Sequence, residues 1–581
     1  MSEDMGLMRA AEVTQRLQNL TVRMTQALAK QPAPNPGIEG PGLDLYATSA
    51  AAWWQQTLGN PAQAVEQAAN FWQASVNAWK GAMHKVNDDG EVLDKRFADA
   101  DWQDNPWFDY LKRQYMVSAN AMQQAVAGIS SLPETDRRRL QFFTDQIVNL
   151  MAPNNFLGSN PAALRRAMET EGESLLKGLE NLVSDLEAND GALLVKLVDE
   201  SAFSVGDNIA TAPGQVVLRT KMMELIQYAP STDTVQEVPI VIFPPWINKF
   251  YVLDLKPQNS MIRWLVDEGY TVFVASWVNP GADLADAGLE DYITDGYLAA
   301  IEAAKVITGQ PSVNAVGYCI AGTTLSLTLS LLDQIGDKSV NSATFFTALT
   351  DFSDQGEFTP FLQDDFVDGI EVEVERCGFL PARVMSRTMS FLRSNDLVYG
   401  PAIRSYMLGE TPPAFDLLYW NGDSTNLPGK MTMQYLRGLC QANAFSEGTF
   451  QLMGHTLSVA DVKVPLMAIT AQTDHIAAWK DCYRGVGKMG SDDKTFILSQ
   501  SGHIAGIVNP PSKGKYGHYT NKKLSGAADD WLEAAKFNQG SWWPLWSEWL
   551  RPRSGEAVPA RTPVETDLGA APGAYVKMRA T

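Results

Sequence analysis

Cys319 stands in the segment of the sequence with the clearest chemical meaning, GYCIAG at residues 317–322. An apolar run at residues 313–316 precedes it and a stretch rich in Thr, Leu and Ser follows, which predicts a strand, a sharp turn and a helix. A G-x-S-x-G sequence at such a turn presents a nucleophilic serine, and here cysteine takes that position. The small residues Gly317 and Ala321 leave room for the turn, and the positive end of the helix favours a thiolate. Because free cysteines are often buried, a purely structural cysteine also fits the spacing.

Few histidines are available to serve this nucleophile. The sequence contains His84, His455, His475, His503 and His518. Folds built around this turn place the nucleophile, the acid and the histidine in that chain order. Asp474 follows an apolar run at residues 464–470, and His503 follows another at residues 495–499. The sequence therefore predicts Cys319 as nucleophile, His503 as general base and Asp474 as the acid that orients it. Taken singly, His503 is equally compatible with a surface loop and Asp474 with a turn or cap.

Attack on an acyl group also needs donors for the negative charge that develops on its oxygen. The first is expected to be the backbone N–H of Ile320, the residue after the nucleophile. The second should come from the loop after the first predicted strand, PPWINK at residues 244–249, where we expect the backbone N–H of Ile247.

The elements that must position these residues begin at about residue 201, where short apolar runs alternate with turns and amphipathic segments. The runs occupy residues 238–244, 270–277, 312–319, 343–349, 464–470 and 495–499. Strands that alternate with helices predict an α/β fold with a mostly parallel sheet covered on both faces. The interval from 349 to 464 is too long for one crossover, so we expect a cap inserted at about residues 352–441.

The regions on either side of this pattern differ from it. Residues 1–200 repeat apolar side chains at a spacing of three to four, which predicts a helical N-terminal domain before a catalytic domain at 201–581. Beyond Arg551 the chain is rich in Pro, Gly and Ala, which predicts an end without a fold of its own.

Composition excludes several classes of function. The 581 residues carry 46 basic and 67 acidic side chains, a net charge of −21, which argues against nucleic-acid binding and against charge-driven binding to anionic lipid. Four cysteines and five histidines without ligand spacing indicate neither a disulfide scaffold nor a metal site. Residues 312–332 lack charge but contain polar side chains and a turn, so a buried strand and helix explain them better than a membrane span. No secretory signal is recognisable, and a cytoplasmic enzyme without a cofactor is expected.

At this point the chain resembles the polyhydroxyalkanoate synthases of the single-subunit class I, which have the α/β-hydrolase fold. GYCIAG resembles the family box G-x-C-x-G-G, and the resemblance covers most of residues 200–550. Further family-like segments are INKFYVLDLKPQNS, FLRSNDLVYG, FDLLYWNGDSTNLPG, DHIAAW, SGHIAGIVNPP and GSWWPLW. Ala321 stands where the family usually has Gly, and Ala478 where it usually has Pro. The N-terminal third matches only loosely.

The resemblance implies polymerisation of (R)-3-hydroxyacyl-CoA, with short-chain 3-hydroxybutyryl-CoA expected, into an intracellular polyester with release of CoA. Cys319 would carry the chain as a thioester and His503 would activate it. The family assigns the aspartate, here Asp474, to activating the 3-hydroxyl, directly or through the histidine, whereas the residues themselves indicate an orienting role, and both remain open. The resemblance also implies association with polyester granules and a homodimer, to which the inserted segment would contribute.

Two other functions are compatible with the same residues. A thiol hydrolase of this fold, such as an intracellular polyester depolymerase or esterase, would release free acids. A non-catalytic granule-coat protein would leave the order of Cys, Asp and His unexplained. Because CoA is anionic and the protein acidic, a synthase needs a local basic entrance, for which Lys249, Arg387 and Arg393 are candidates.

Overall fold

The structure is a computed structural model, which describes residues 2–31, 35–39, 43–84 and 94–580. The chain forms two compact units. One combines Met1–Asp199 with Arg387–Ala414, and the other combines Glu200–Ser386 with Phe415–Thr581. The middle of the insertion expected at residues 352–441 therefore belongs to the first unit.

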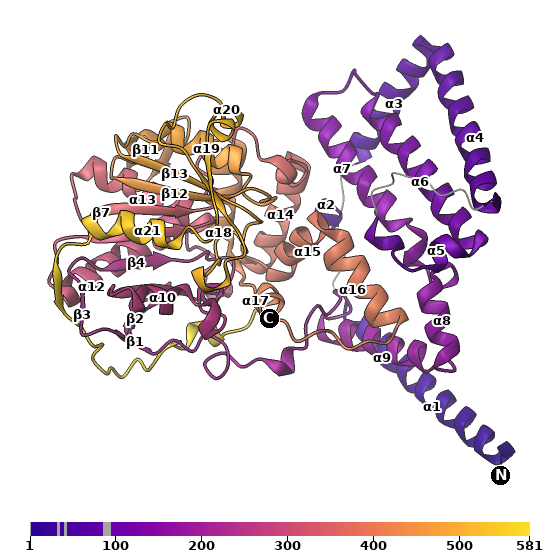
Figure 1. The fold of residues 1–581 in the computed structure, drawn as a ribbon, viewed down its shortest axis with the longest axis horizontal. Coiled ribbons are helices and arrows are strands. Elements are labelled where there is room, and N and C mark those ends of the chain that lie inside the picture. The colour runs from indigo at the N-terminus through magenta and orange to yellow at the C-terminus, as the bar shows by residue number, and fades with distance from the viewer. Residues whose placement is uncertain (1, 32–34, 40–42, 85–93, 581) are drawn as a thin grey trace. The chain divides into compact units, whose positions relative to one another are not determined.

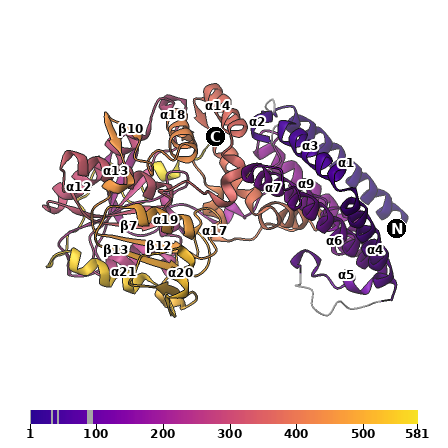
Figure 2. The same cartoon turned by 90° about the horizontal axis from the view of Figure 1, so that it is seen from above.

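The first unit is built from helices (Figure 1 and Figure 2). They are α1 (Ser2–Leu28), α2 (Pro36–Glu39), α3 (Leu43–Gly59), α4 (Pro61–His84), α5 (Asp101–Asp104), α6 (Pro106–Ala127), α7 (Glu134–Leu150), α8 (Pro161–Glu169), α9 (Glu173–Ala188) and α16 (Gly400–Ala402). Local sequence explains where they begin: Asn105 and Asn160 cap α6 and α8, and a proline follows each cap. Arg16 of α1 forms ion pairs with Glu173 and Glu180 of α9.

Residues 387–414 pack closely on α9. The hydroxyl of Tyr406 donates to Asp185 Oδ2 at 2.6 Å. A Cβ at Gly178 would lie 2.0 Å from the carbonyl oxygen of Tyr406, so only glycine fits there. Figure 1 shows this segment in orange beside the violet helices of the unit.

The second unit contains a ten-stranded sheet in the order β1-β2-β5-β4-β6-β7-β12-β13-β14-β15. The strands are β1 (Gly214–Arg219), β2 (Met223–Tyr228), β4 (Ile240–Phe243), β5 (Val272–Trp277), β6 (Val313–Tyr318), β7 (Val340–Phe346), β12 (Leu466–Ala471), β13 (Lys494–Ser499), β14 (His518–Thr520) and β15 (Lys536–Asn538). The six predicted runs form β4, β5, β6, β7, β12 and β13, which are adjacent and parallel. The antiparallel strands at both edges were not predicted, because they are short or contain buried polar residues such as Glu224.

Helices cover both faces of this sheet. They are α10 (Met261–Asp267), α11 (Leu289–Asp291), α12 (Ala299–Thr308), α13 (Ile320–Ile335), α19 (Trp479–Lys488), α20 (Ala528–Glu533) and α21 (Trp543–Leu550). Gly317 of β6 packs on α13, while the next residue, Tyr318, contacts Phe346, whose ring meets Trp546 of α21 at 5.3 Å. Because neighbouring side chains of a strand point to opposite faces, α13 and α21 lie on opposite faces of the sheet.

The C-terminal residues, predicted to lack a fold of their own, are ordered by contacts with the rest of the second unit. β16 (Ala557–Pro559) pairs with β3 (Thr234–Gln236). Further on, Val216 of β1 donates its N–H to Gly569 at 2.9 Å, and Ala571 donates to Gly214 at 2.9 Å. In Figure 1 the yellow chain runs from α21 past β3 and β1. The segment has no core of its own and instead uses the edge of the sheet, which composition alone does not show.

The two ends of the insertion meet at a polar base in the second unit. Its parts in this unit include α14 (Asp364–Cys377), the start of α15 (Ala382–Leu392), α17 (Asp416–Gly422), α18 (Gly429–Met433) and the π-helix Gln434–Gln441. Asn443 donates to Asp351 Oδ1 at 3.0 Å and accepts the N–H of Phe352 at 2.8 Å. Lys488 reaches Asp351 Oδ2 at 2.8 Å. These contacts fasten both ends of the insertion to α19.

Asp351→Asn is expected to destabilise this base by about 1–3 kcal/mol, because a buried carboxylate that pairs with Lys488 is replaced by a neutral amide. Burial alone would raise the pKa of Asp351, but the hydrogen bonds from Lys488, Ser353 and Asn443 lower it. Its stabilisation is thus present above the ordinary pKa near 3.8 and is lost as the pH falls through the lower folded value. Urea unfolding at pH 7 and pH 3 measures this. An equal loss of stability at both pH values would contradict the account.

Candidate active site

Cys319 lies at the sharp turn between β6 and α13. Its backbone has φ 56° and ψ −129°, a conformation that residues with a side chain rarely adopt. The Cys319 N–H donates to the carbonyl of Phe346 at 2.7 Å and fixes the turn to β7. A Cβ at Gly317 would lie 2.6 Å from the Cα of Gly322, so these two positions require glycine. The sequence indicated Gly317 and Ala321 as the small residues, and the structure adds Gly322.

Asp474 and His503 come together from loops after β12 and β13. His503 Nδ1 and Asp474 Oδ2 are 2.7 Å apart. Asp474 Oδ1 accepts the N–H groups of Ile476 at 2.8 Å and Ala477 at 2.9 Å, so the carboxylate is fixed on both sides. The His503 side chain also interacts electrostatically with Cys319. With Nδ1 donating to Asp474, the other ring nitrogen is the one that can accept the thiol proton.

The charges around His503 favour its protonated form. Burial alone would lower the pKa of His503, but the negative charges of Asp474 and Cys319 raise it to about 10. A proton transferred from the thiol to this imidazole is therefore held by an imidazolium that has an anion on either side.

The loop that carries His503 is fastened by aromatic side chains. The hydroxyl of Tyr318 donates to the His503 carbonyl at 3.0 Å. Trp542 donates its indole N–H to Gly506 at 2.8 Å, and Trp543 donates to Ile507 at 2.9 Å. Sequence reasoning treated these tryptophans as core and did not assign Tyr318 a role. In the sequence, the only signal that these side chains hold the His503 loop is that a buried indole N–H or phenol hydroxyl needs an acceptor.

Tyr318→Phe is expected to lower turnover about 3- to 10-fold, because losing one hydrogen bond of about 1 kcal/mol loosens the His503 carbonyl without removing a reacting group. Initial rates of CoA release measure the effect. Tyr519→Phe, on the antiparallel strand β14, is the matched control and should turn over at the wild-type rate. A loss in the Tyr318 variant as large as that expected on removing His503 would contradict the positioning role.

The loop at residues 244–249 lies over the start of α13. Trp246 donates its indole N–H to Thr324 Oγ1 at 3.3 Å. Its carbonyl accepts the Thr425 hydroxyl at 2.7 Å, and the Ile247 carbonyl accepts the Thr425 N–H at 3.1 Å. Ile320 begins α13, and the N–H groups of the first helical turn have no acceptor within the helix.

The three predicted catalytic residues are nearly closed off from solvent. Cys319 is 9 %, His503 7 % and Asp474 8 % exposed. Tyr435 of the insertion places its ring 5.9 Å from that of Trp246. The insertion thus reaches the loop beside the nucleophile.

Two other cysteines differ from Cys319 in their surroundings. Burial raises the pKa of Cys440 to about 12, and burial together with the charge of Asp474 raises the pKa of Cys482 well above its ordinary value. Both thiols therefore stay protonated near neutral pH.

Lys249 is not the free entrance cation suggested by its place in the sequence. It is 3 % exposed and donates to backbone carbonyls of the C-terminal segment. Arg387 and Arg393 lie in the helical unit.

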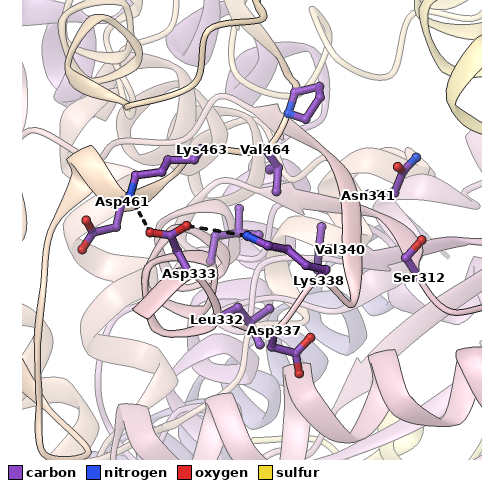
Figure 3. A pocket seen from close by; sticks show the side chains of 12 residues that line it. Ser312, Leu332, Asp333, Asp337, Lys338, Val340, Asn341, Asp461, Lys463 and Val464 are labelled. Carbon is purple, nitrogen blue, oxygen red and sulfur yellow. Dashed lines mark hydrogen bonds and ion pairs between the residues drawn. The ribbon is translucent and has the colours of Figure 1, made fainter. Parts of the chain in front are cut away.

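A separate hollow of about 320 Å³ opens at the amino ends of β6, β7 and β12 (Figure 3). Asp333 lies in it and pairs with Lys463 at 2.6 Å and with Lys338 at 4.0 Å. Cys319 follows the carboxyl end of β6, so this hollow is not part of the candidate active site.

Comparison with known proteins decides the family. The family description "Poly-beta-hydroxybutyrate polymerase (PhaC) N-terminus" matches residues 93–265, and "alpha/beta hydrolase fold" matches residues 238–510. A poly(3-hydroxyalkanoate) polymerase of Methylorubrum extorquens is 40% identical over 516 residues, which cover 88% of this chain and 85% of the relative. The chain belongs to the poly(3-hydroxyalkanoate) polymerase family. It is therefore an acyltransferase with the α/β-hydrolase fold, as the sequence predicted.

Other members of the polymerase family align over similar lengths. Poly(3-hydroxyalkanoate) polymerase subunit PhaC of Rhizobium meliloti (strain 1021) is 37% identical over 533 residues, 90% of this chain and 87% of the relative. The protein of that name from Cupriavidus necator is 37% identical over 551 residues, 93% of this chain and 91% of the relative. These matches favour a polymerase over the hydrolase and the coat protein. In the described part of this polymerase, no helix has the length and apolar character that crossing a membrane requires.

Proposed function

We propose that this polymerase joins (R)-3-hydroxyacyl-CoA units, with short-chain 3-hydroxybutyryl-CoA as the expected substrate, through a thioester on Cys319. The observation that carries the proposal is a cysteine at a strained strand-to-helix turn beside the hydrogen-bonded His503–Asp474 pair. This is the geometry of nucleophilic acyl transfer.

In the first half-reaction, His503 takes the thiol proton and the Cys319 sulfur attacks the thioester carbonyl of the substrate. The N–H groups of Ile320 and Ile247 hold the oxyanion. The carbon–sulfur bond to CoA breaks, and the CoA thiol leaves with the proton from His503. One thioester replaces another, so little free energy is lost.

In the second half-reaction, the 3-hydroxyl group of a further hydroxyacyl-CoA attacks the thioester on Cys319. His503 accepts the hydroxyl proton, an ester bond forms and the Cys319 sulfur is released to be protonated again. The lengthened chain is now a CoA thioester and returns to Cys319 by another first half-reaction. Forming an oxoester from a thioester is downhill, which gives cysteine an advantage over serine. A serine would give up that free energy in the first half-reaction.

Asp474 is proposed to act through His503. Both of its carboxylate oxygens are already occupied, one by two backbone N–H groups and the other by the imidazole. Its side chain is fully buried. These contacts favour an orienting and charge-stabilising role over direct contact with the 3-hydroxyl.

The insertion is proposed to keep water from the thioester, since hydrolysis would waste it. Tyr435 and Phe352, whose rings lie 6.0 Å apart, bring apolar surface to this side of the site. We also propose that the enzyme works as a homodimer at the surface of the polyester granules it makes, where the insoluble chain returns to Cys319 after each addition.

Purified protein with (R)-3-hydroxybutyryl-CoA tests the proposed function. CoA thiol release and the product are followed together. Thiol release with insoluble polyester is the expected result, whereas thiol release with free hydroxyacid alone would indicate a hydrolase and contradict the proposal. Sedimentation of the active protein tests the dimer.

A further inference from the structure

Lys249 ends the loop proposed to donate to the oxyanion, and its side chain is buried. Burial lowers the pKa of Lys249, and the charge of Asp423 opposes this effect. A buried ammonium is costly unless hydrogen-bond acceptors surround it. The acceptors at Lys249 therefore decide where this end of the loop can lie.

Most of these acceptors come from the far end of the chain. Lys249 Nζ donates to the carbonyl of Val576 at 3.0 Å and to that of Met578. Asp423 Oδ1 lies 3.8 Å from the same nitrogen, and Asp423 Oδ2 accepts the hydroxyl of Tyr251 at 2.8 Å. More than 320 residues of sequence separate Lys249 from its two carbonyl partners.

The segment that supplies these carbonyls, residues 574–578, is fixed independently of Lys249. Glu224 is fully buried and accepts the N–H groups of Ala574 at 2.8 Å and Tyr575 at 2.9 Å. The hydroxyl of Tyr575 donates to the carbonyl of Thr220 at 2.8 Å. The two carbonyls are thus presented by a segment anchored on β2 and the turn before it.

The insertion holds the same loop through its backbone. Trp420 donates its indole N–H to the Lys249 carbonyl at 2.6 Å. Thr425 binds the carbonyls of Trp246 and Ile247, as described above. The loop is therefore held through its carbonyls by the insertion and through the Lys249 side chain by residues 574–578.

We propose that residues 574–578 are a positioning element of the active centre, which acts by holding Lys249 and so placing the backbone N–H of Ile247. The inference rests on the proposed oxyanion role of Ile247. Lys249 is a positioning residue in this account and contacts no reacting atom. A misplacement of about 1 Å near reacting groups costs about 10²-fold in rate, so loss of the contact should lower kcat far more than it raises KM.

Two variants test the proposal, with (R)-3-hydroxybutyryl-CoA as the substrate. Lys249→Met removes the donor, and truncation after Tyr575 removes the acceptors. Each is expected to lower kcat about 10- to 100-fold with KM changed less than about 3-fold. Lys463→Met, an exposed lysine in the hollow at the opposite ends of the strands, is the matched control and should keep the wild-type kcat.

Alkylation of Cys319 by iodoacetamide separates this role from general damage, because displacement of iodide needs the Cys319–His503 pair and no oxyanion donor. Its rate should stay within about 2-fold of wild type in both variants. A parallel loss of alkylation and turnover, or unchanged turnover, would overturn the inference. If the proposed function itself is wrong, alkylation of Cys319 will leave the turnover of the wild type intact, which is a different result.

Combining the two changes tests directly whether residues 574–578 act through Lys249. Truncation of the wild type leaves the Lys249 ammonium without its carbonyl acceptors, whereas methionine at this position needs none. Truncation in the Lys249→Met background should therefore cost less than about 3-fold, although it costs 10- to 100-fold alone. Independent, multiplicative losses would show that the tail acts elsewhere and would overturn the proposal.

Discussion

Cys319→Ala is expected to lower CoA release by about 10⁴-fold or more. Cys319, His503 and Asp474 are proposed to act together, and removing the nucleophile abolishes the covalent route. Radiolabelled substrate should leave no acyl group on the protein, and no insoluble polyester should form. The assay follows thiol release, acylated protein and polymer in the same sample.

Cys319→Ser and Cys377→Ala complete this test. The serine variant is expected to accept an acyl group slowly and then to retain it, because transfer from an oxoester to a hydroxyl is no longer downhill. Cys377 is a partly exposed thiol outside the site, so its alanine variant should keep full activity. Substantial polymer formation by Cys319→Ala would contradict both the proposed nucleophile and the proposed mechanism.

Asp474→Asn is expected to lower kcat by about 10³- to 10⁴-fold at pH 7, because an amide at this position neither fixes the tautomer of His503 nor stabilises its positive charge. The alkylation rate of Cys319 should fall at the same pH and recover as the pH is raised. Asp529→Asn, at an exposed aspartate paired with Lys480, is the control and should show neither effect.

The same variant makes a prediction about stability. Burial lowers the pKa of His503, but Asp474 and Cys319 raise it to about 10, above the ordinary value of 6.5. The pair therefore adds stability that is fully present below about pH 6.5 and is lost as the pH rises through about 10. Thermal midpoints measured from pH 6 to pH 10 should fall in the wild type and change less in Asp474→Asn. Parallel curves for the two proteins would contradict the charge pairing.

The sequence by itself determined the core of the sheet and the order of the predicted catalytic residues. Six apolar runs predicted the six adjacent parallel strands, because a strand buried on both faces must be apolar along its whole length. GYCIAG predicted the turn at Cys319, because steric crowding there demands small neighbours. Asp474 and His503 could be chosen because chain order places them after successive strands, at the same edge of the sheet.

The tertiary structure alone decided the contacts that hold these residues in place. Nothing near Lys249 in the sequence shows that Val576 and Met578 will accept its hydrogen bonds, and a composition rich in Pro, Gly and Ala predicted only an end without a fold of its own. The hydrogen bond from Tyr318 to His503 and those from the tryptophans of α21 have no local pattern either. The physical reason is that the periodicity of apolar residues records local burial, whereas a buried donor meets its acceptor only where the fold brings distant segments together.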